Sequence, residues 1–212
     1  AMRNNLDTVA TIVRHRWSTD CMRTQQLTIE FRSKRQDVLP YVGQVVKAAE
    51  SDRVALGWFP FKVYEEAAIS ERLIVAIARE ADEERYAGHL LFTATFPRGY
   101  VMQIHVDSNH RRHGIAKRML DALKNQLSAF NYISIGARIA EDLRASQEFW
   151  QSQDFYAHGT AAGGKTRGRT LVLRSHELPT QQLFATSGLS HRDPLGLAIE
   201  PSTATKLYLL DL

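Results

Sequence analysis

The chain has very little cysteine and no long apolar run. Cys21 is the only cysteine among the 212 residues, which excludes an internal disulfide bond and a metal cluster built on several cysteines. No apolar stretch approaches the roughly 20 residues that a membrane-spanning helix needs, and no signal peptide opens the sequence. We therefore expect a cytoplasmic protein with no membrane partner. The histidines have no metal-ligand partners at suitable spacing, so no metal site is expected.

Positive charge is grouped locally rather than present in large excess. The net charge is only +4, but basic residues cluster at 14–16, 32–35 and 110–113. Each cluster is either solvated surface or part of a site for a polyanion, such as a phosphorylated cofactor or a nucleic acid. Composition does not choose between the two, so a nucleic-acid partner is permitted but not indicated.

Hydrophobic periodicity predicts an α/β (α+β) domain, a mixed sheet with helices on both faces, over residues 26–178. Strands are expected at 27–31, 72–79, 87–96, 99–107 and 132–137, and on either side of the loop 159–166. Helices are expected near 37–49, 64–70, 114–127 and 141–153. Short connections join the strands between 72 and 107, which favours antiparallel neighbours.

The two ends of the chain differ from this central region. Residues 1–25 form a polar N-terminal extension, whereas residues 179–212 are rich in Pro, Ser, Thr and Gly and read as a tail or linker. The final "TKLYLLDL" resembles the opening strand of PIN-type nuclease domains, in which Asp211 would match the first metal-binding carboxylate. That resemblance implies a truncated second domain after the linker.

The octet "GTAAGGKT" at 159–166 matches the phosphate-binding pattern G-x-x-x-x-G-K-[ST]. A working loop of this type must open a helix, because helix N-terminal amides supply the anion site. Here it is followed by the β-rich "RTLVLRS". The octet therefore predicts the connection of a β-hairpin rather than a nucleotide site.

A better anion site is the strand, turn and helix at 100–127. The first turn of a helix has unpaired N–H groups and the positive end of the helix dipole, so it can hold an anion. Gly114 and Ala116 leave space for a phosphate to approach the backbone. Cationic side chains surround the same place: Arg111, Arg112, Lys117 and Arg118. Taken alone, the segment is also compatible with an ordinary corner that has a basic surface.

The run "RRHGIA" at 111–116 resembles the R/Q-x-x-G-x-G/A signature of the GNAT superfamily of N-acetyltransferases, and "IHVDSNH", "ERLIVAI" and "YAGHLLF" are similar to its strands. The resemblance implies a mixed, mostly antiparallel sheet of six to seven strands. It also implies that acetyl-CoA binds with its diphosphate on the backbone of 112–117 and its pantetheine where strand 103–106 splays from strand 132–137. The cofactor-binding residues it implies are Ile104, Val106, Arg111, Arg112, His113, Gly114, Ile115, Ala116 and Lys117.

The candidate catalytic residues lie on the central strand. Gln103 and His105 are two residues apart, so their side chains share one face. Acetyl transfer needs a neutral amine, and His105 suits a general base, directly or through water, although a packed strand histidine is the alternative. The family's usual acid is a tyrosine on the later helix, but Trp150 stands there, and an indole cannot usefully protonate a thiolate. Water, Tyr132 or Tyr156 would then assist the departing thiolate.

Three functions are compatible with these features. The first is an acetyl-CoA-dependent N-acetyltransferase that acts on a small-molecule or peptide amine. The second is an inactive or weakly active acyl-CoA-binding module of a larger, toxin-like nuclease, which the replacement at Trp150 favours. The third is acetylation of aminoacyl-tRNA, as in some toxin members of the family. The sequence identifies neither the acceptor nor the oligomeric state, and a homodimer is allowed. The aromatic segment 58–61 either shapes the acceptor pocket or fills the core.

Overall fold

A seven-stranded sheet organises the described part of the chain. The computed structural model describes residues 27–80, 83–163 and 168–179. The strands are β1 (Thr28–Arg32), β2 (Leu73–Glu80), β3 (Glu83–Thr95), β4 (Arg98–Val106), β5 (Ser134–Ala140), β6 (Tyr156–Ala162) and β7 (Thr170–Glu177). They lie in the order β1-β2-β3-β4-β5-β7-β6, and every neighbouring pair is antiparallel except β4 and β5. The predicted mixed, mostly antiparallel sheet is confirmed.

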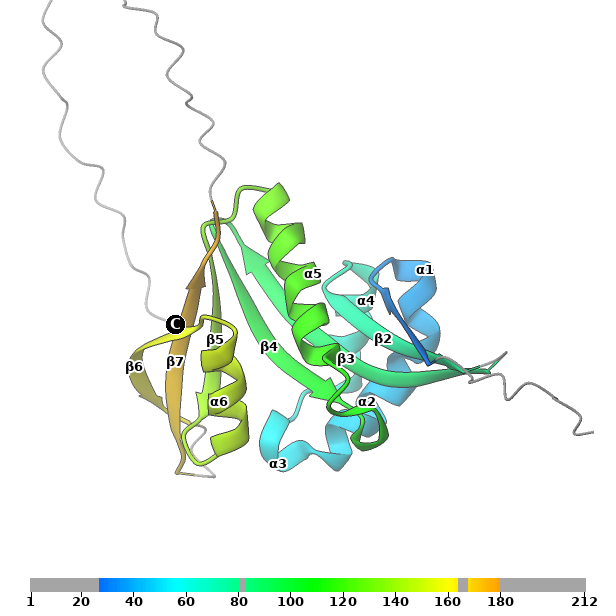
Figure 1. Ribbon diagram of the computed structural model, residues 1–212, viewed down its shortest axis with the longest axis horizontal. Coiled ribbons are helices and arrows are strands. Elements are labelled where there is room, and N and C mark those ends of the chain that lie inside the picture. Colours follow the sequence, from blue (N-terminus) through cyan, green and yellow to red (C-terminus); the bar gives the residue numbers. More distant parts are fainter. Residues whose placement is uncertain (1–26, 81–82, 164–167, 180–212) are drawn as a thin grey trace, which may run out of the picture. The chain divides into compact units, whose positions relative to one another are not determined.

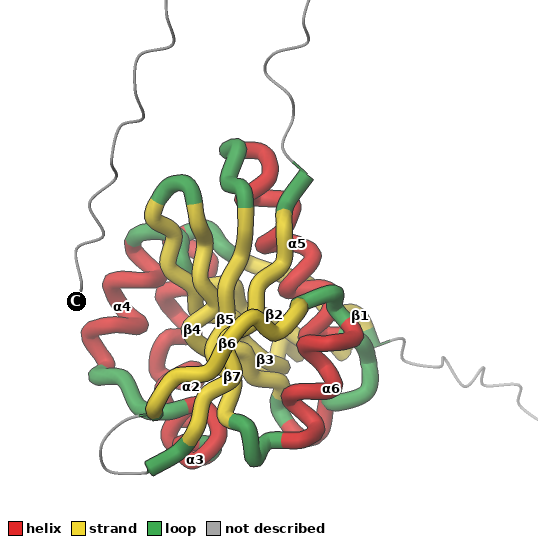
Figure 2. The backbone as a smooth tube through the Cα atoms, turned by 90° about the vertical axis from the view of Figure 1, so that its left-hand side faces the viewer, coloured by secondary structure: helices red, strands yellow, loops and turns green. Residues whose placement is uncertain are grey.

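Helices cover both faces of this sheet, as predicted. The helices are α1 (Arg35–Val38), α2 (Val42–Ser51), α3 (Arg53–Leu56), α4 (Phe61–Ile69), α5 (Ile115–Ala129) and α6 (Arg144–Ser152), with 3-10 turns η1 (Leu39–Tyr41) and η2 (Ser108–His110). Figure 1 shows α5 and α6 in front of the sheet, and the edge-on view of Figure 2 shows the strands between two groups of helices. None of the described helices is long and apolar enough to cross a membrane.

Two hydrophobic clusters hold the layers together. One lies under α5 and α6 and contains Leu120, Leu123 and Trp150; the other lies under α1, α2 and α4 and contains Val45 and Tyr64. Each fully buried large apolar side chain contributes about 1.5–3 kcal/mol relative to an exposed one. The sheet is therefore fixed from both sides, and its strands form a rigid support for side chains placed between them.

Residues 159–162 of the P-loop-like octet lie in β6, one strand of a β-hairpin, whereas the whole octet was expected to form the connection. Gly159 lies in β6, which pairs antiparallel with β7 from Tyr156 opposite Ser175 to Ala162 opposite Thr170. Residues 164–167 lie outside the described residues, and so do the N-terminal extension 1–25 and residues 180–212 with Asp211. The expected extension, linker and PIN-like start stay predictions.

A close backbone contact joins β3 and β4, the two strands of the central hairpin. A Cβ built on Gly88 in β3 would lie 2.5 Å from the carbonyl oxygen of His105 in β4, whereas one on Gly43 in α2 would meet nothing within 4 Å. Glycine at position 88 therefore lets the two strands approach. The same hairpin carries both candidate catalytic residues.

Gly88→Ala should destabilise the fold, because the methyl group must push the backbone of β4 away, at a cost of roughly 1–3 kcal/mol. Gly43→Ala is the matched control, and it should stabilise by roughly 0.5–1 kcal/mol because alanine favours helix. Urea unfolding followed by circular dichroism measures both free energies. Equal stability of the Gly88→Ala variant and the parent chain would contradict this account of the hairpin.

Candidate active site

The site is built where β4 and β5 separate. The two strands pair in parallel only from Arg98 opposite Ser134 to Val101 opposite Ala137. Beyond Val101, β4 continues to Val106 with β3 on one side only. This is the splay that the family resemblance implies, and it leaves the β5-facing backbone edge of residues 102–106 available to a ligand.

A β-bulge in β4 begins at the same point. Phe92 lies opposite Val101 and Leu91 lies opposite Gln103, so Met102 is an extra residue with no partner in β3. Bulges re-aim side chains and leave a residue out of the ladder. Gln103 and His105 consequently face the α2 and α4 side, where both are buried, while Met102 is exposed.

A small cavity lies in the gap between β4 and β5. Its volume is about 80 Å³. Its walls come from α3, β4, β5 and α6 and consist of Ala55, Leu56, Val101, Met102, Gln103, Ile104, Ala137, Arg138, Ile139, Ala140, Leu143, Ser146 and Trp150. Gln103 and Ile104 are thus predicted residues that reach the cavity. His105, Tyr132 and Tyr156 are not among its walls.

The loop that follows β4 has the backbone of an anion site. Arg112 (φ 68°) and Gly114 (φ 69°) both adopt the left-handed conformation, and α5 starts directly afterwards at Ile115. Turns of this kind aim successive N–H groups into one concavity, and the first N–H groups of α5 have no acceptor within the helix. A Cβ on Gly114 would meet nothing within 4 Å, so space lies open there. An anionic group fits this loop.

The cations of this loop differ in where they point. Arg112 and His113 are exposed, and Lys117 bonds Asp121 at 2.9 Å on the first turns of α5. The guanidinium of Arg118 instead lies 4.7 Å from the ring centre of Phe31 and donates to the carbonyl of Ile29. The expectation that Arg118 surrounds the anion is therefore wrong, because β1 takes its side chain.

His105 lies in a buried polar network. Its Nε2 is 3.1 Å from Oδ2 of Asp52, in the turn between α2 and α3, and its Nδ1 is 3.1 Å from the hydroxyl of Tyr86. The same hydroxyl is 2.6 Å from Nδ1 of His89, whose Nε2 is 3.5 Å from Oε1 of Gln103. Gln103 accepts from the Tyr64 hydroxyl and donates to the carbonyl of Leu56.

The Tyr86 hydroxyl contacts the Nδ1 atoms of both His89 and His105, which limits how the protons of this network can be placed. Tyr86 has one hydroxyl proton, so it donates to one imidazole and accepts from the other. One of the two histidines therefore carries its proton on Nδ1. Burial, more than any neighbouring charge, raises the pKa of Tyr86, so the phenol keeps its proton.

Burial also keeps both histidines neutral. Desolvation lowers the pKa of His89 to about 3, and neighbouring His105 lowers it further. Desolvation is likewise the largest influence on His105 and lowers its pKa, while Asp52 raises it and Arg111 lowers it. At neutral pH the imidazole of His105 is thus able to accept a proton.

The position of the usual acid holds no proton donor of that kind. Trp150 is buried and packs edge-to-face on Phe155 at 4.7 Å between ring centres. Tyr132, an expected substitute, contacts Phe96 outside the cavity, and Tyr156 donates to Glu177 at 3.0 Å. Tyr132 precedes β5 and Tyr156 begins β6, and neither side chain lines the cavity, so the structure does not place either one as the expected substitute acid.

Several site residues had no role assigned from the sequence: Asp52, Leu56, Tyr64, Tyr86 and Arg138. The sequence assigned no role to His89 either, since it has no metal-ligand partner at suitable spacing. Among the residues that the structure describes, no group of three metal-ligating side chains is present. The sequence signal for His89 was its place in the expected strand 87–96, next to the strand of His105, whereas Tyr86 lies just before that expected strand.

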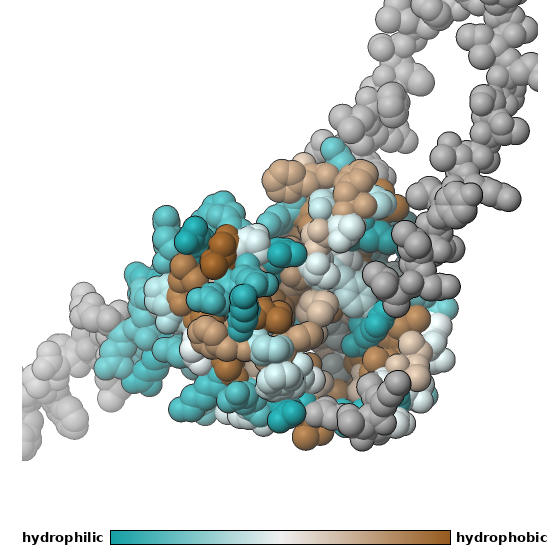
Figure 3. Space-filling view, turned by 180° about the vertical axis from the view of Figure 1, so that it is seen from behind, coloured by the Kyte–Doolittle hydropathy of each residue, from teal (hydrophilic) through white to brown (hydrophobic). Residues whose placement is uncertain are grey.

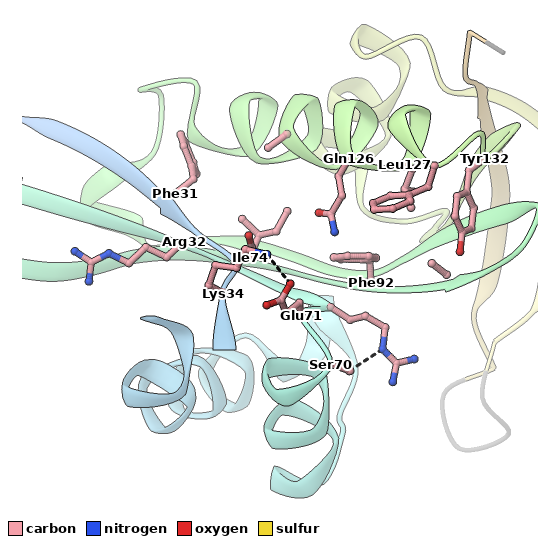
Figure 4. A pocket seen from close by; sticks show the side chains of 15 residues that line it. Phe31, Arg32, Lys34, Ser70, Glu71, Ile74, Phe92, Gln126, Leu127 and Tyr132 are labelled. Carbon is pink, nitrogen blue, oxygen red and sulfur yellow. Dashed lines mark hydrogen bonds and ion pairs between the residues drawn. The ribbon is translucent and has the colours of Figure 1, made fainter. Parts of the chain in front are cut away.

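A much larger hollow lies away from this site. A groove of about 790 Å³ opens between β1, β2, β3 and the C-terminal half of α5. Figure 4 shows Phe31, Phe92, Leu127 and Tyr132 around it, with the 2.9 Å ion pair of Lys34 and Glu71 at one side. The anion loop precedes the opposite end of α5, about 22 Å along a 15-residue helix. The larger hollow and the candidate site therefore lie in different parts of the fold.

The exposed apolar side chains of α3, α4 and the segment between them are scattered. Viewed from the face opposite that of Figure 1, hydrophobic residues are interspersed among hydrophilic ones (Figure 3). Val54, Trp58, Phe61 and Ile69 are exposed, while Phe59 packs against the cluster under α2 and α4. Of the aromatic segment 58–61, Phe59 therefore fills the core, while Trp58 and Phe61 are exposed and do not line the cavity; the expected role in an acceptor pocket stays a prediction.

The buried, neutral state of His89 should make the fold less stable in acid. An unfolded histidine binds a proton near pH 6.5, whereas the pKa of His89 in the fold is about 3. Between these values the unfolded chain binds more protons, so the free energy of unfolding falls as pH falls, by up to about 1.4 kcal/mol per pH unit. Urea unfolding from pH 7.5 to 4.5 measures the slope. His89→Gln should flatten it, and an unchanged slope would contradict the assignment.

Comparison with known proteins agrees with the fold. A sequence profile of the acetyltransferase (GNAT) family matches residues 25–155. No protein of curated function matches the chain significantly in sequence.

Solved structures supply the similarity in fold. The NatC complex bound to Gag peptide and CoA matches with a TM-score of 0.62 at 14% identity, over 71% of this chain and 99% of that one. The ribosomal-protein-S18-alanine N-acetyltransferase of Escherichia coli matches at 0.56 and 12% identity, over 74% and 99%. The acetyltransferase yncA of Salmonella typhimurium, solved with acetyl-CoA, matches at 0.58 and 14%, over 76% and 99%.

The family profile covers more than half of the chain, and the splayed strands, the bulge and the anion loop occur together in one fold. The chain belongs to the GNAT family of acetyltransferases.

Proposed function

We propose that this protein is an acetyl-CoA-dependent N-acetyltransferase that transfers the acetyl group directly to an amine. The observation that carries the proposal is the continuity of the open β4–β5 gap with the anion loop at the end of β4. A ligand with a phosphate group at one end and an extended arm matches this arrangement. Structural neighbours solved with acetyl-CoA or CoA support it.

The residues present fit the two parts of such a cofactor. The backbone N–H groups from Arg112 to Lys117 would hold the diphosphate, with Arg111, His113 and Ile115 shaping the loop. Ile104 and Val106 would line the pantetheine arm along the free edge of β4. The cofactor supplies an activated acetyl thioester when it is bound. Met102, left out of the β3 ladder by the bulge, lies in the cavity wall where the arm would end.

His105 would take the proton that the amine loses. The amine must be neutral to attack a thioester, so a base is required near the acceptor side. His105 does not line the cavity, and a water would therefore carry the proton to it. The side-chain amide of Gln103 accepts from Tyr64 and donates to the carbonyl of Leu56. It would hold β4 against α3 and keep the cavity wall in place.

The acceptor would approach over α3. Ala55 and Leu56 of α3 line the cavity, and Arg169 donates to the carbonyl of Val54 at 2.6 Å, which connects α3 to the start of β7. The acceptor class is an amine of a peptide or a small molecule. A structural neighbour solved with a peptide and CoA supports the peptide class, and a panel of both kinds of amine would decide.

A cofactor-binding module without activity is the second candidate. The buried indole of Trp150 and the lack of a tyrosine hydroxyl among the described cavity walls favour it. Thiol release from acetyl-CoA over the amine panel separates the two functions. Release above the rate without protein identifies the enzyme, whereas tight binding of CoA with no release identifies the module.

His105→Gln should lower kcat for the best acceptor by roughly 10²–10⁴-fold, because the proton acceptor is lost. The affinity for CoA should stay within about twofold, since the imidazole does not reach the anion loop. Thiol release and isothermal titration measure the two quantities. An unchanged kcat would remove His105 from the mechanism without affecting cofactor binding.

Gly114→Val should weaken CoA binding by tenfold or more (about 1.4 kcal/mol at least), because a β-branched residue disfavours the left-handed conformation and fills the open space over the loop. Gly168→Val is the matched control, since Gly168 also has a positive φ (55°) but precedes β7. Titration calorimetry compares both variants. Equal losses of affinity would show that strain, and not the loop, explains the effect.

A further inference from the structure

One carboxylate joins the anion loop to the candidate base. Oδ2 of Asp52 lies 3.1 Å from Nε2 of His105 and 3.2 Å from Nη2 of Arg111. Arg111 is the first residue of the family signature, and it also donates from Nε to the carbonyl of Val106 at 3.1 Å. Asp52 therefore connects a cation of the diphosphate site with the imidazole on β4.

The two halves of Arg111 are held differently. Its Nε is fixed to the strand end, while the Nη2 group lies against Asp52 on a side chain that is 54% exposed. The Asp52 side chain is 40% exposed. The exposed ion pair is weak because water screens it. A diphosphate carries more negative charge than a carboxylate, so it can take the outer part of the guanidinium from Asp52.

The charges around His105 determine what such an exchange does. The titratable and charged groups that face it are Asp52 from the α2–α3 turn, Tyr86 and His89 from β3, Arg111 from the loop and Asp107 just after β4. His89 is neutral and Tyr86 keeps its proton, so neither changes the charge at neutral pH. Asp52 and Asp107 favour a proton on His105, whereas Arg111 opposes it.

We propose that Asp52 is a positioning residue that sets the proton affinity of His105, and that the cofactor's diphosphate strengthens this base by drawing Arg111 away from Asp52. The proposal rests on the function proposed above. Its consequence is an order of events: the base gains its full proton affinity only when the diphosphate occupies the loop. A proton taken from the acceptor amine then rests on an imidazole whose positive charge the freed carboxylate compensates.

Histidine side-chain NMR measures this directly. The chain has eight histidines, so the signals of His105 are assigned by their loss in His105→Gln. The pKa of His105 is determined in the free protein, with saturating CoA and with inorganic pyrophosphate as a probe of the loop alone. We expect a rise of roughly one unit with CoA, since a nearby charge moves a pKa by this order.

Three variants isolate the contacts in the free protein. Asp52→Asn should lower the pKa of His105 and shift the pH profile of kcat in the same direction, because the carboxylate is lost. Arg111→Met should raise the pKa before any ligand is added, and CoA should then raise it little further. Lys117→Met is the matched control: it removes one positive charge from the first turn of α5, next to the loop, but Lys117 contacts Asp121 and not Asp52, so the free pKa of His105 should stay unchanged.

The outcomes separate this inference from the proposed function. CoA that binds without moving the pKa of His105 would overturn the inference and leave the proposed function standing. Absence of CoA binding would remove the proposed function, and the free-protein titrations of Asp52→Asn and Arg111→Met would still decide the role of Asp52. Equal shifts in Arg111→Met and Lys117→Met would show general charge effects and overturn the inference as well.

Discussion

Parallel pairing between β4 and β5 stops at Val101, and the candidate site depends on that interruption. Backbone N–H and C=O groups are normally paired inside a sheet, so an edge opened in its middle needs a partner from elsewhere. The bulge at Met102 begins where the pairing ends, and the anion loop begins where β4 ends. One strand thus carries the free edge, the redirected side chains and the turn into α5.

The polar network on the α2 and α4 side of β4 costs folding free energy, because its side chains are removed from water. Two histidines, Tyr64 and a glutamine are buried on the α2 and α4 side and Tyr86 is half-buried beside them, where an apolar core would serve stability equally well. Their hydrogen bonds satisfy most of the polar atoms, but desolvation keeps His89 and His105 neutral over a range in which free histidines titrate. The fold is therefore less stable in acid, and both imidazoles are unprotonated at neutral pH. Buried groups with shifted pKa values of this kind are typical of functional sites.

The sequence allowed the fold and the anion loop to be predicted, but not the network. Gly114 and the preceding arginines are adjacent in the chain, so their pattern can be recognised from a single sequence. The partners of His105 depend on register. Counted from the turn, where Thr95 lies opposite Arg98, His89 would face Ile104; the bulge at Met102 brings His105 there instead. A second bulge, at Ala87 in β3, places Tyr86 and His89 on one side although they are three residues apart.

Other parts of the site have no signal at all in one sequence. Asp52 is separated from His105 by the whole of α3, α4, β2 and β3, and only the packing of α2 on the sheet brings them together. Asp154 has φ 63°, a conformation that aspartate tolerates better than most residues, so the backbone after α6 keeps its turn.

The most direct test of the whole account is the map of backbone amide shifts when acetyl-CoA is added to isotopically labelled protein. The account predicts that the largest changes fall on residues 112–117 and on 102–106, with smaller ones on the facing strand 137–140. Changes centred on the groove around Phe31, Phe92 and Tyr132, or no changes at saturating cofactor, would contradict it.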